Sequence, residues 1–285
     1  MKIQTVFERT EKKYILTLSQ RRRLLEMVNN YIKPDEYGES TVCSLYFDTP
    51  DSRLIRQSME KPVYKEKLRL RSYSTPKAGS NVFLELKKKY NGVVYKRRKT
   101  LEYTVAKSYI ENGVLPDDSQ IMREIDWTMH YYKDIAPKMF IAYDRTAFYS
   151  KTDHELRITF DRNVRFRTDN LDLGKGHYGE RILDRDLCIM EIKALSAMPL
   201  WLTDALSELH VFPGTFSKYG TAYQITEQRK NDYDDEFSCK GGLNCAWLDF
   251  STYLYLNRPT HRFRLSDLLR CFAPARRGHR VGFGL

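Results

Sequence analysis

The fold is decided by residues 61–99, which read KPVYKEKLRLRSYSTPKAGSNVFLELKKKYNGVVYKRRK. Three segments of this stretch alternate charged and apolar residues with the period of two that is typical of a β-strand. The Asn-Gly pair at 91–92 predicts a tight turn between the second and third segments. The sequence therefore predicts three neighbouring antiparallel strands, each with one charged and one apolar face.

The charged faces of these strands carry the whole net charge of the protein. The stretch holds 13 Lys and Arg against 2 Asp and Glu, a balance of +11, whereas the rest of the chain holds 35 of each. One such strand is most simply a solvated face. Three together place like charges on paired strands, where each pair costs about 4 kcal/mol before screening at ~4 Å and an effective dielectric constant of ~20. We therefore expect an anionic ligand on this surface, which carries Lys65, Lys67, Arg69, Arg71, Glu85, Lys87, Lys89, Lys96 and Arg98.

Length and composition favour a globular protein. A chain of 285 residues with 41% hydrophobic and 13% aromatic residues can bury a sizeable core and is not wholly disordered. The start is charged throughout, unlike a signal peptide, and no run of ~18 apolar residues could span a bilayer. Five cysteines, an odd number without metal-ligand spacing, favour a reducing compartment. We expect a cytoplasmic protein with no transmembrane segment.

Further strands and a few helices surround the basic stretch. The predicted helices include one at 19–32, with Ser19 as cap, and one that begins at Pro50 and is capped by Thr49. Others are predicted at 104–112, 119–132 and 199–210. Nearly every strand has one charged and one apolar face, so the apolar faces need helices as cover and the charged faces line the interior. The sequence predicts an α+β fold, a closed antiparallel barrel with a charged lumen and helices outside, whose other strands are expected at 5–16, 41–48, 138–149, 155–161 and 187–193.

The chain is expected to divide into a domain at 1–230 and a tail at 231–285. From Asp232 the sequence becomes acidic, then Gly- and aromatic-containing, and finally basic, and its periodicity is poor. Three of the five cysteines lie there. The tail is either an appendage that packs weakly or a sequence that was not selected for folding. We assign it no function.

Familiar catalytic motifs are absent from the sequence. Neither GxxxxGK[ST] nor GxGxxG occurs, so backbone amides at a helix N-terminus are not expected to hold phosphate. The histidines show no HExxH or triad-like context. What remains is side-chain recognition, in which Arg and Lys bind phosphoryl oxygens and a few carboxylates hold Mg²⁺ or Mn²⁺.

Nine short pieces, in order along residues 3–230, resemble the VTC domain, the polyphosphate polymerase branch of the triphosphate tunnel metalloenzymes. They are FERTEKKYIL, SLYFDTPD, EKLRLRSY, FLELKKK, VYKRRKT, YDRTAFYS, ELRITFDRNVRFR, IMEIKALSAMP and TFSKYGTAY. The resemblance implies an eight-stranded tunnel that binds ATP with Mn²⁺ or Mg²⁺ and transfers the terminal phosphoryl group onto inorganic polyphosphate.

The resemblance also implies site residues. Lys13 would contact the phosphate at the reaction centre, Lys218 would close one end of the tunnel, and Glu191 would bind the metal. The ExExK motif of the hydrolase and cyclase members appears as Arg9-x-Glu11-x-Lys13, which leaves Glu11 as the second metal ligand and weakens the case for hydrolysis or cyclisation. Arg69 and Arg71 complete the expected catalytic set, and the substrate-binding set is Lys67, Lys87, Lys96, Arg98, Arg145 and Arg157.

Three other functions compete with the polymerase. If water replaces the chain end as acceptor, the same site is a triphosphatase. Loss of the metal or of the reaction-centre lysine would leave a polyphosphate-binding module, although Lys13, Glu191 and Lys218 are all present. A nucleic-acid binder would interleave aromatic residues with its cations, whereas leucines alternate with Lys67, Arg69 and Arg71, so no nucleic-acid partner is expected.

Overall fold

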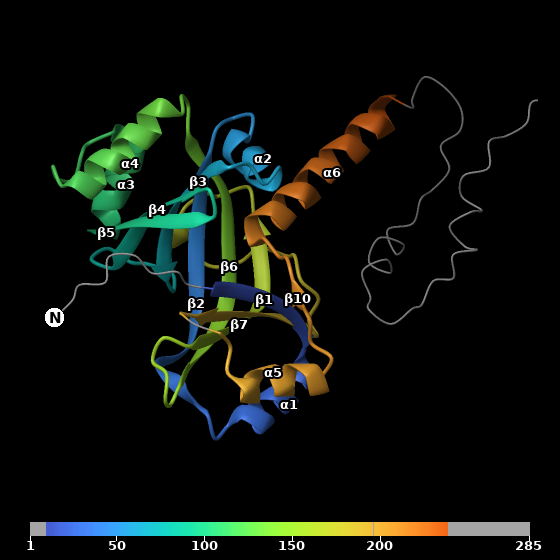
Figure 1. The fold of residues 1–285 in the computed structure, drawn as a ribbon. Helices are drawn as coiled ribbons and strands as arrows, with labels where there is room; N and C mark the ends of the chain where they lie inside the picture. Colours follow the sequence, from blue (N-terminus) through green and yellow to red (C-terminus); the bar gives the residue numbers. More distant parts are fainter. Residues whose placement is uncertain (1–9, 196, 239–285) are drawn as a thin grey trace, which may run out of the picture. The chain divides into compact units, whose positions relative to one another are not determined.

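The computed structural model of the chain describes residues 10–195 and 197–238. These residues form a mixed α+β fold built on one ten-stranded antiparallel sheet (Figure 1). The strands are ordered β10-β1-β9-β7-β6-β2-β3-β4-β5, and β8 pairs with β7. Their bounds are β1 Thr10–Thr17, β2 Ile32–Asp48, β3 Tyr64–Tyr73, β4 Asn81–Tyr90, β5 Val93–Glu102, β6 Ala136–Ser150, β7 Arg157–Arg167, β8 Glu180–Arg181, β9 Leu187–Ala194 and β10 Pro213–Gly214. The helices are α1 Leu18–Val28, α2 Arg53–Met59, α3 Tyr103–Asn112, α4 Gln120–Tyr131, α5 Leu200–Glu208, α6 Lys218–Ser238 and the short 3-10 helix η1 Leu173–Lys175.

The closed eight-stranded barrel that we expected is not seen, because the sheet is open. Within the described residues β5 pairs only with β4, and the opposite end of the strand order is β10. Part of the reason is local: at Lys13 and Tyr14 the strand β1 already pairs with β9 on one side and with Pro213 and Gly214 of β10 on the other. No free edge of β1 is left there for β5 to join.

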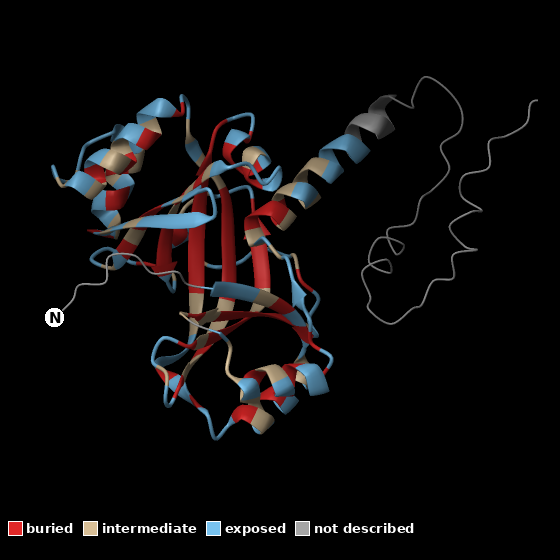
Figure 2. Cartoon of the chain, viewed as in Figure 1, coloured by how far each residue is buried: buried red, intermediate tan, exposed pale blue. Residues whose placement is uncertain are grey.

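The outer face of the sheet is apolar and covered by helices, as the sequence predicts. Leu24 and Val28 of α1 and Leu202 of α5 pack on β1, β7 and β9. The helices α3 and α4 and η1 cover β2, β3, β4 and β6. Figure 2 shows the buried residues concentrated on the central strands.

The opposite face, which we call the inner face, carries the predicted cations. In the register of the sheet Lys67, Arg69 and Arg71 of β3 share this face, while Leu68 and Leu70 lie on the outer face. The inner face is not uniformly charged. A third apolar cluster lies on it, formed by residues of β2, β6, β7 and β9, the segment before β9, α2 and the first turns of α6. Its members are Val42, Tyr46, Ile55, Met139, Ile141, Tyr143, Val164, Phe166, Leu183, Ile189, Tyr219 and Ala222.

The helix α6 passes the boundary that we expect for the tail. The chain divides into two compact units between Asn231 and Asp232, and α6 continues to Ser238. Residues 239–285, and with them three of the five cysteines, lie outside the described residues. Cys43 and Cys188 are free and buried. Among the described helices, none is long and apolar enough to cross a membrane.

Candidate functional site

Glu85, on β4, lies at the centre of the predicted basic face and is buried. Its carboxylate lies 2.7 Å from Arg69, 2.6 Å from Lys96 and 2.5 Å from Arg98, and Arg71 Nε is 4.0 Å away. Burial alone would raise the pKa of Glu85, but Arg69 and Arg71 outweigh burial and hold it well below its usual value. One buried anion on β4 therefore fixes four of the predicted cations, two on each of the flanking strands β3 and β5.

Asp161, on β7, forms a second such centre and is fully buried. Arg145 donates to both of its oxygens, at 2.6 and 2.8 Å, and Lys218 Nζ at the start of α6 donates at 2.6 Å. Burial would raise the pKa of Asp161, but Lys218 and Arg145 lower it far more. The same contact raises the pKa of Lys218 despite its burial. Asp161 thus positions two predicted site residues, Arg145 and Lys218, that lie far apart in the sequence.

Tyr143 joins the Glu85 and Asp161 centres into one surface, and Tyr46 adds a second hydroxyl beside the Glu85 centre. Arg71 donates to the Tyr143 hydroxyl at 3.2 Å, and the Tyr143 ring lies 4.4 Å from Lys218 Nζ and 5.1 Å from Arg145 Cζ. Arg69 donates to the Tyr46 hydroxyl at 3.1 Å. Burial would raise the pKa of Tyr46, but the cations around it, Arg69 first, lower it to about 8.

Among the predicted site residues that the structure describes, Lys67 and Lys87 are the cations that lack an anion. They are register partners on β3 and β4, and within the described residues no carboxylate forms an ion pair with either. Burial, with the neighbouring charges of Lys65, Lys87 and Lys13, lowers the pKa of Lys67 to about 8. Burial also lowers the pKa of Lys87, and Glu11 and Lys13 of β1 act on it from across the inner face. Uncompensated positive charge therefore gathers where β1 faces β3 and β4, which favours an anion there.

The predicted metal ligands Glu11 and Glu191 share one lysine. Glu191 is the register partner of Lys13, and Glu11 is the register partner of Lys193. Lys193 Nζ lies 2.6 Å from Glu191 and 4.0 Å from Glu11, while Lys13 Nζ lies 3.4 Å from Glu11. The structure thus brings Lys13, Glu11 and Glu191 together, and the arginine that opens the RxExK motif lies outside the described residues.

These residues fit a divalent metal only if phosphate completes its set of ligands. No group of three or more His, Cys, Asp or Glu that could hold an ion occurs in the described part of the chain. Thr159, the register partner of Glu191 on β7, has a buried hydroxyl without a hydrogen-bond partner. Mg²⁺ is commonly held by one or two carboxylates with water and substrate phosphates as further ligands. Glu191, Glu11 and Thr159 therefore suit an ion that is shared with phosphate, and they do not form a complete protein-only cage.

Arg157 is not brought into either centre. It pairs with Asp35 of β2 at 3.0 Å and lies over the Tyr149 ring at 5.1 Å. In the register it lies beside Lys193, at the start of β7 and two residues before Thr159. Its buried Nε has no hydrogen-bond partner. Arg157 therefore sits at the start of β7, next to the residues that suit a metal.

Four residues that organise the surface are missing from the predicted site set: Glu85, Asp161, Tyr46 and Tyr143. The alternation of each strand places all four on the inner face, so the sequence contains their position. It does not contain their role, because that depends on contacts across strands. The charge pattern could have revealed the two carboxylates. Each is an acid among cations on one strand face: Glu85 lies on β4 opposite Arg98 of β5, and Asp161 lies on β7 opposite Arg145 of β6.

Comparison with known proteins bears on the family. No match to the chain was found among curated proteins. Among solved structures, the chain is similar to a proposed adenylate cyclase from Bacillus halodurans, with 14% identity and a TM-score of 0.48 over 73% of this chain and 92% of that one. It is also similar to a proposed adenylate cyclase from Vibrio parahaemolyticus, with 15% identity and a TM-score of 0.41 over 77% and 99% of the two chains.

The match to a protein family covers most of the chain. Residues 8–227 match the VTC domain. This range contains every site residue that the sequence predicts, from Glu11 to Lys218, and both carboxylate centres of the inner face. The chain therefore belongs to the VTC domain family.

Proposed function

We propose that this protein is a polyphosphate polymerase that transfers the terminal phosphoryl group of ATP onto inorganic polyphosphate. The supporting observation is the length of the cationic row on the inner face. From Arg71 to Lys65 the row runs ~20 Å at ~3.3 Å per residue, which is longer than a triphosphate requires. Lys87 and Lys96 of the neighbouring strands lie beside Lys67 in the same row. A chain of phosphates would use this length.

In this reaction the protein mainly positions the reacting phosphates and stabilises their charge. The terminal oxygen of the acceptor chain bonds to the γ-phosphorus of ATP, and the bond from that phosphorus to the oxygen bridging to the β-phosphate breaks, so that ADP leaves. Arg69 and Arg71, held by Glu85, and Lys218, held by Asp161, supply fixed donors for the phosphate oxygens. Lys67, Lys87 and Lys13 supply further positive charge for the phosphate chain where β1 faces β3 and β4. A bound Mn²⁺ or Mg²⁺ would neutralise phosphate charge, held by Glu191, Glu11 and Thr159.

The decisive experiment distinguishes transfer to a chain from transfer to water. The full chain is incubated with ATP and Mn²⁺, and the products are resolved on a gel with ADP measured in parallel. A polymerase yields phosphate chains together with ADP, and Arg69→Ala or Arg71→Ala reduces both. If ADP and orthophosphate are the only products at every ATP concentration, the protein is a triphosphatase and the proposal is wrong. If ATP is not turned over with metal, the protein only binds phosphate chains.

Neighbouring lysines on β4 provide a matched pair of variants for this assay. Lys87 lies on the inner face without a carboxylate partner, whereas Lys88 points to the other face, 4.0 Å from Glu66 and 5.8 Å from the Trp127 ring centroid. A hydrogen bond to a charged group contributes about 1.5–3 kcal/mol. We expect Lys87→Met to reduce chain synthesis about 10- to 100-fold. Lys88→Met should leave it within about twofold, because its charge does not reach the inner face.

Glu191→Gln tests the metal assignment. The change keeps the shape of a buried side chain and removes the anion, so we expect metal-dependent activity to be lost while the chain stays folded. Activity is measured across Mn²⁺ concentrations, and folding by circular dichroism and thermal unfolding. Full activity with an unchanged metal requirement would show that Glu191 serves only as the partner of Lys193.

A further inference from the structure

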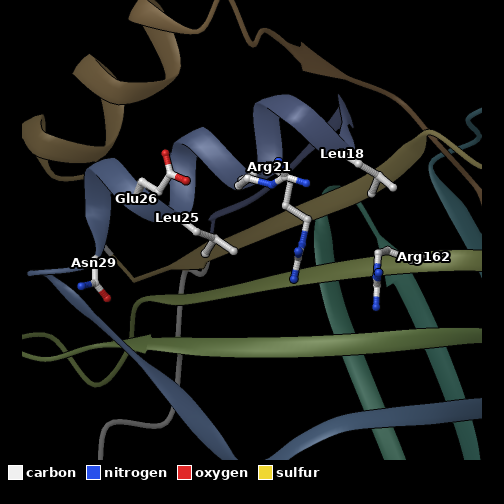
Figure 3. Close-up of a pocket in the computed structure, with 7 residues that line it drawn as sticks. Leu18, Arg21, Leu25, Glu26, Asn29 and Arg162 are labelled. Atoms are coloured by element: carbon white, nitrogen blue, oxygen red, sulfur yellow. The ribbon is translucent and has the colours of Figure 1, made fainter.

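A groove with a volume of about 580 Å³ lies on the outer side of the sheet, between α1 and β7. Leu18, Arg21 and Leu25 line it from the helix, and Arg162 lines it from the strand (Figure 3). Neighbouring residues of a strand point to opposite faces. Arg162 therefore points away from the inner face that carries Asp161, and the groove is separate from the site described above.

Arg21 is a half-buried cation without a carboxylate partner in the described part of the chain. Its guanidinium donates to the Thr146 hydroxyl at 3.2 Å and lies 5.1 Å from the centroid of the Phe160 ring. Its Nε is buried and has no hydrogen-bond partner. Buried charges in proteins are normally paired, because desolvation of an isolated charge is costly. Arg21 thus has an unused donor and an unpaired charge beside an open groove.

A second arginine adds to this charge. Arg162 Nη2 lies 2.5 Å from the Glu39 carboxylate, so Arg162 has one partner of its own. Burial lowers the pKa of Arg21, and the charge of Arg162 lowers it further. Figure 3 shows the two guanidinium groups extended in the same direction from α1 and β7, while the carboxylate of Glu26, which also lines the groove, is directed away from them. The pair therefore has a net positive charge that the protein leaves in place.

We propose that this groove is a second anion site, which binds a phosphoryl group through Arg21 and Arg162. Guanidinium groups bind phosphate oxygens with directed hydrogen bonds, and the several oxygens of one phosphoryl group can accept from both arginines at once. The two negative charges of the phosphoryl group exceed the single charge of a carboxylate. Binding sites for small molecules span about 300–1,000 Å³, so the groove can take a small phosphate compound, or the end of a phosphate chain, against Leu18 and Leu25.

Arginine side-chain signals test this site directly. The full chain is labelled with ¹⁵N-arginine, and the Nε–H signals are followed by NMR during titration with sodium orthophosphate, with long-chain polyphosphate, and with sodium chloride at matched ionic strength. The Arg21 signal is assigned by its loss in Arg21→Met, and the Arg162 signal by its loss in Arg162→Met. We expect both signals to move with a phosphate and to stay in place with chloride. A response to orthophosphate identifies a free phosphate as ligand, and a response to polyphosphate alone identifies a chain.

Matched variants complete the test. Arg21→Met should abolish the response of Arg162, whereas Arg23→Met, on an exposed side chain of the same helix, should leave it intact. If Arg21→Met does not fold, Arg21→Lys keeps the charge but removes Nε, and it should weaken the Arg162 response at least threefold. The proposal is overturned if neither phosphate moves the two signals, or if chloride moves them equally. The readout is local to the groove, so it does not depend on activity at the inner face.

Discussion

The charge of Lys67 depends on its surroundings, because burial and neighbouring lysines lower its pKa to about 8. Tyr46 lies on the same surface and also has a pKa of about 8. As pH rises through 8, Lys67 loses a positive charge and Tyr46 gains a negative one. Both changes weaken the attraction for phosphate. We predict that the affinity for tripolyphosphate falls between pH 7 and pH 9, as measured by titration calorimetry.

Variants divide this pH dependence between the two groups. Lys67→Met should lower the affinity about 10- to 100-fold at pH 7, as expected for a hydrogen bond to a charged group. Tyr46→Phe should remove only the part of the pH dependence that comes from ionisation of the phenol. The double variant should have a nearly flat profile, and one as steep as the wild type would contradict the prediction. Because the folded pKa of Lys67 lies below its ordinary 10.5, the unfolded chain binds more protons between those values, so this lysine makes stability rise with pH from about 8 upward.

Glu85 is predicted to be a stabilising residue as well as an organising one. Glu85→Gln leaves Arg69, Arg98 and Lys96 facing one another without their common anion, and breaking a buried ion pair costs about 3–5 kcal/mol. Glu124→Gln is the control, since Glu124 pairs with Arg97 on a more exposed part of the sheet and should cost less than ~1 kcal/mol. Urea unfolding measures both, and tripolyphosphate should restore part of the loss at Glu85 only. Equal losses in the two variants would contradict this role.

At the scale of residues, the sequence predicts which side chains share a face but not how they pair. The period of a strand is fixed, so Lys67, Arg69 and Arg71 fall together on the inner face. The partner of Arg157 is Asp35, 122 positions away, and only the sheet order brings the two together. For the same reason the sequence does not distinguish Arg69, which already has a carboxylate, from Lys67, which has none.

Among the elements, the start of α6 is fixed by a contact with the end of β2. Tyr219 donates to the buried Asp48 carboxylate at 2.8 Å and stacks on Tyr46 at 4.7 Å, next to Lys218. Tyr219→Phe removes this hydrogen bond and should lower the unfolding free energy by about 1–2 kcal/mol, because the Asp48 carboxylate loses a buried donor. Activity should fall too, since Lys218 is the preceding residue. Tyr223→Phe, one turn further along α6, serves as the control for thermal unfolding and activity, and a similar loss there would contradict the prediction.

The helix starts show where local sequence rules fail. Thr17 caps α1 in a reciprocal arrangement with Gln20, two residues before the Ser19 that we predicted. The Thr49 hydroxyl does accept from the Arg53 amide at 2.9 Å, as a cap would, but the helix that we predicted from Pro50 begins only at Arg53. The Asp48 carboxylate accepts from the next two amides, those of Leu54 and Ile55. A carboxylate six or seven positions away can act as a cap only when a strand end holds it there. Sequence spacing alone does not contain that geometry.

For the whole molecule, the fold class is predictable from the sequence and the closure of the sheet is not. Alternation on many strands, with too few helices to bury both faces, already indicates an antiparallel sheet with one charged face. The two-residue strand β10 at Pro213–Gly214 has no periodicity that could reveal it, yet it takes the side of β1 that closure would need. Short pairings of this kind depend on tertiary contacts, so the pattern of residues in the sequence does not predict them.

The tail is predicted to be dispensable for folding and for activity. Among the residues of α6 whose burial the structure describes, the buried ones are Tyr219, Gly220 and Ala222 in its first turns, and Arg229 still pairs with Glu180 in a chain that ends at Lys230. We therefore expect residues 1–230 to unfold cooperatively, with a midpoint within a few degrees of the full chain, and to retain phosphate binding. Calorimetry and the ATP assay measure this. Precipitation or a broad, non-cooperative transition would show that the tail belongs to the core.

The carboxylates of Glu85 and Asp161 act as built-in counter-ions for the inner face. Because both carboxylates stay buried, the cations are paired before a phosphate arrives and after it leaves, so little reorganisation accompanies each binding step. In the polymerase that we propose, a phosphate chain moving along β3 would meet cations that are already held in place. This arrangement would favour stepwise movement of a growing chain over tight retention of a finished one.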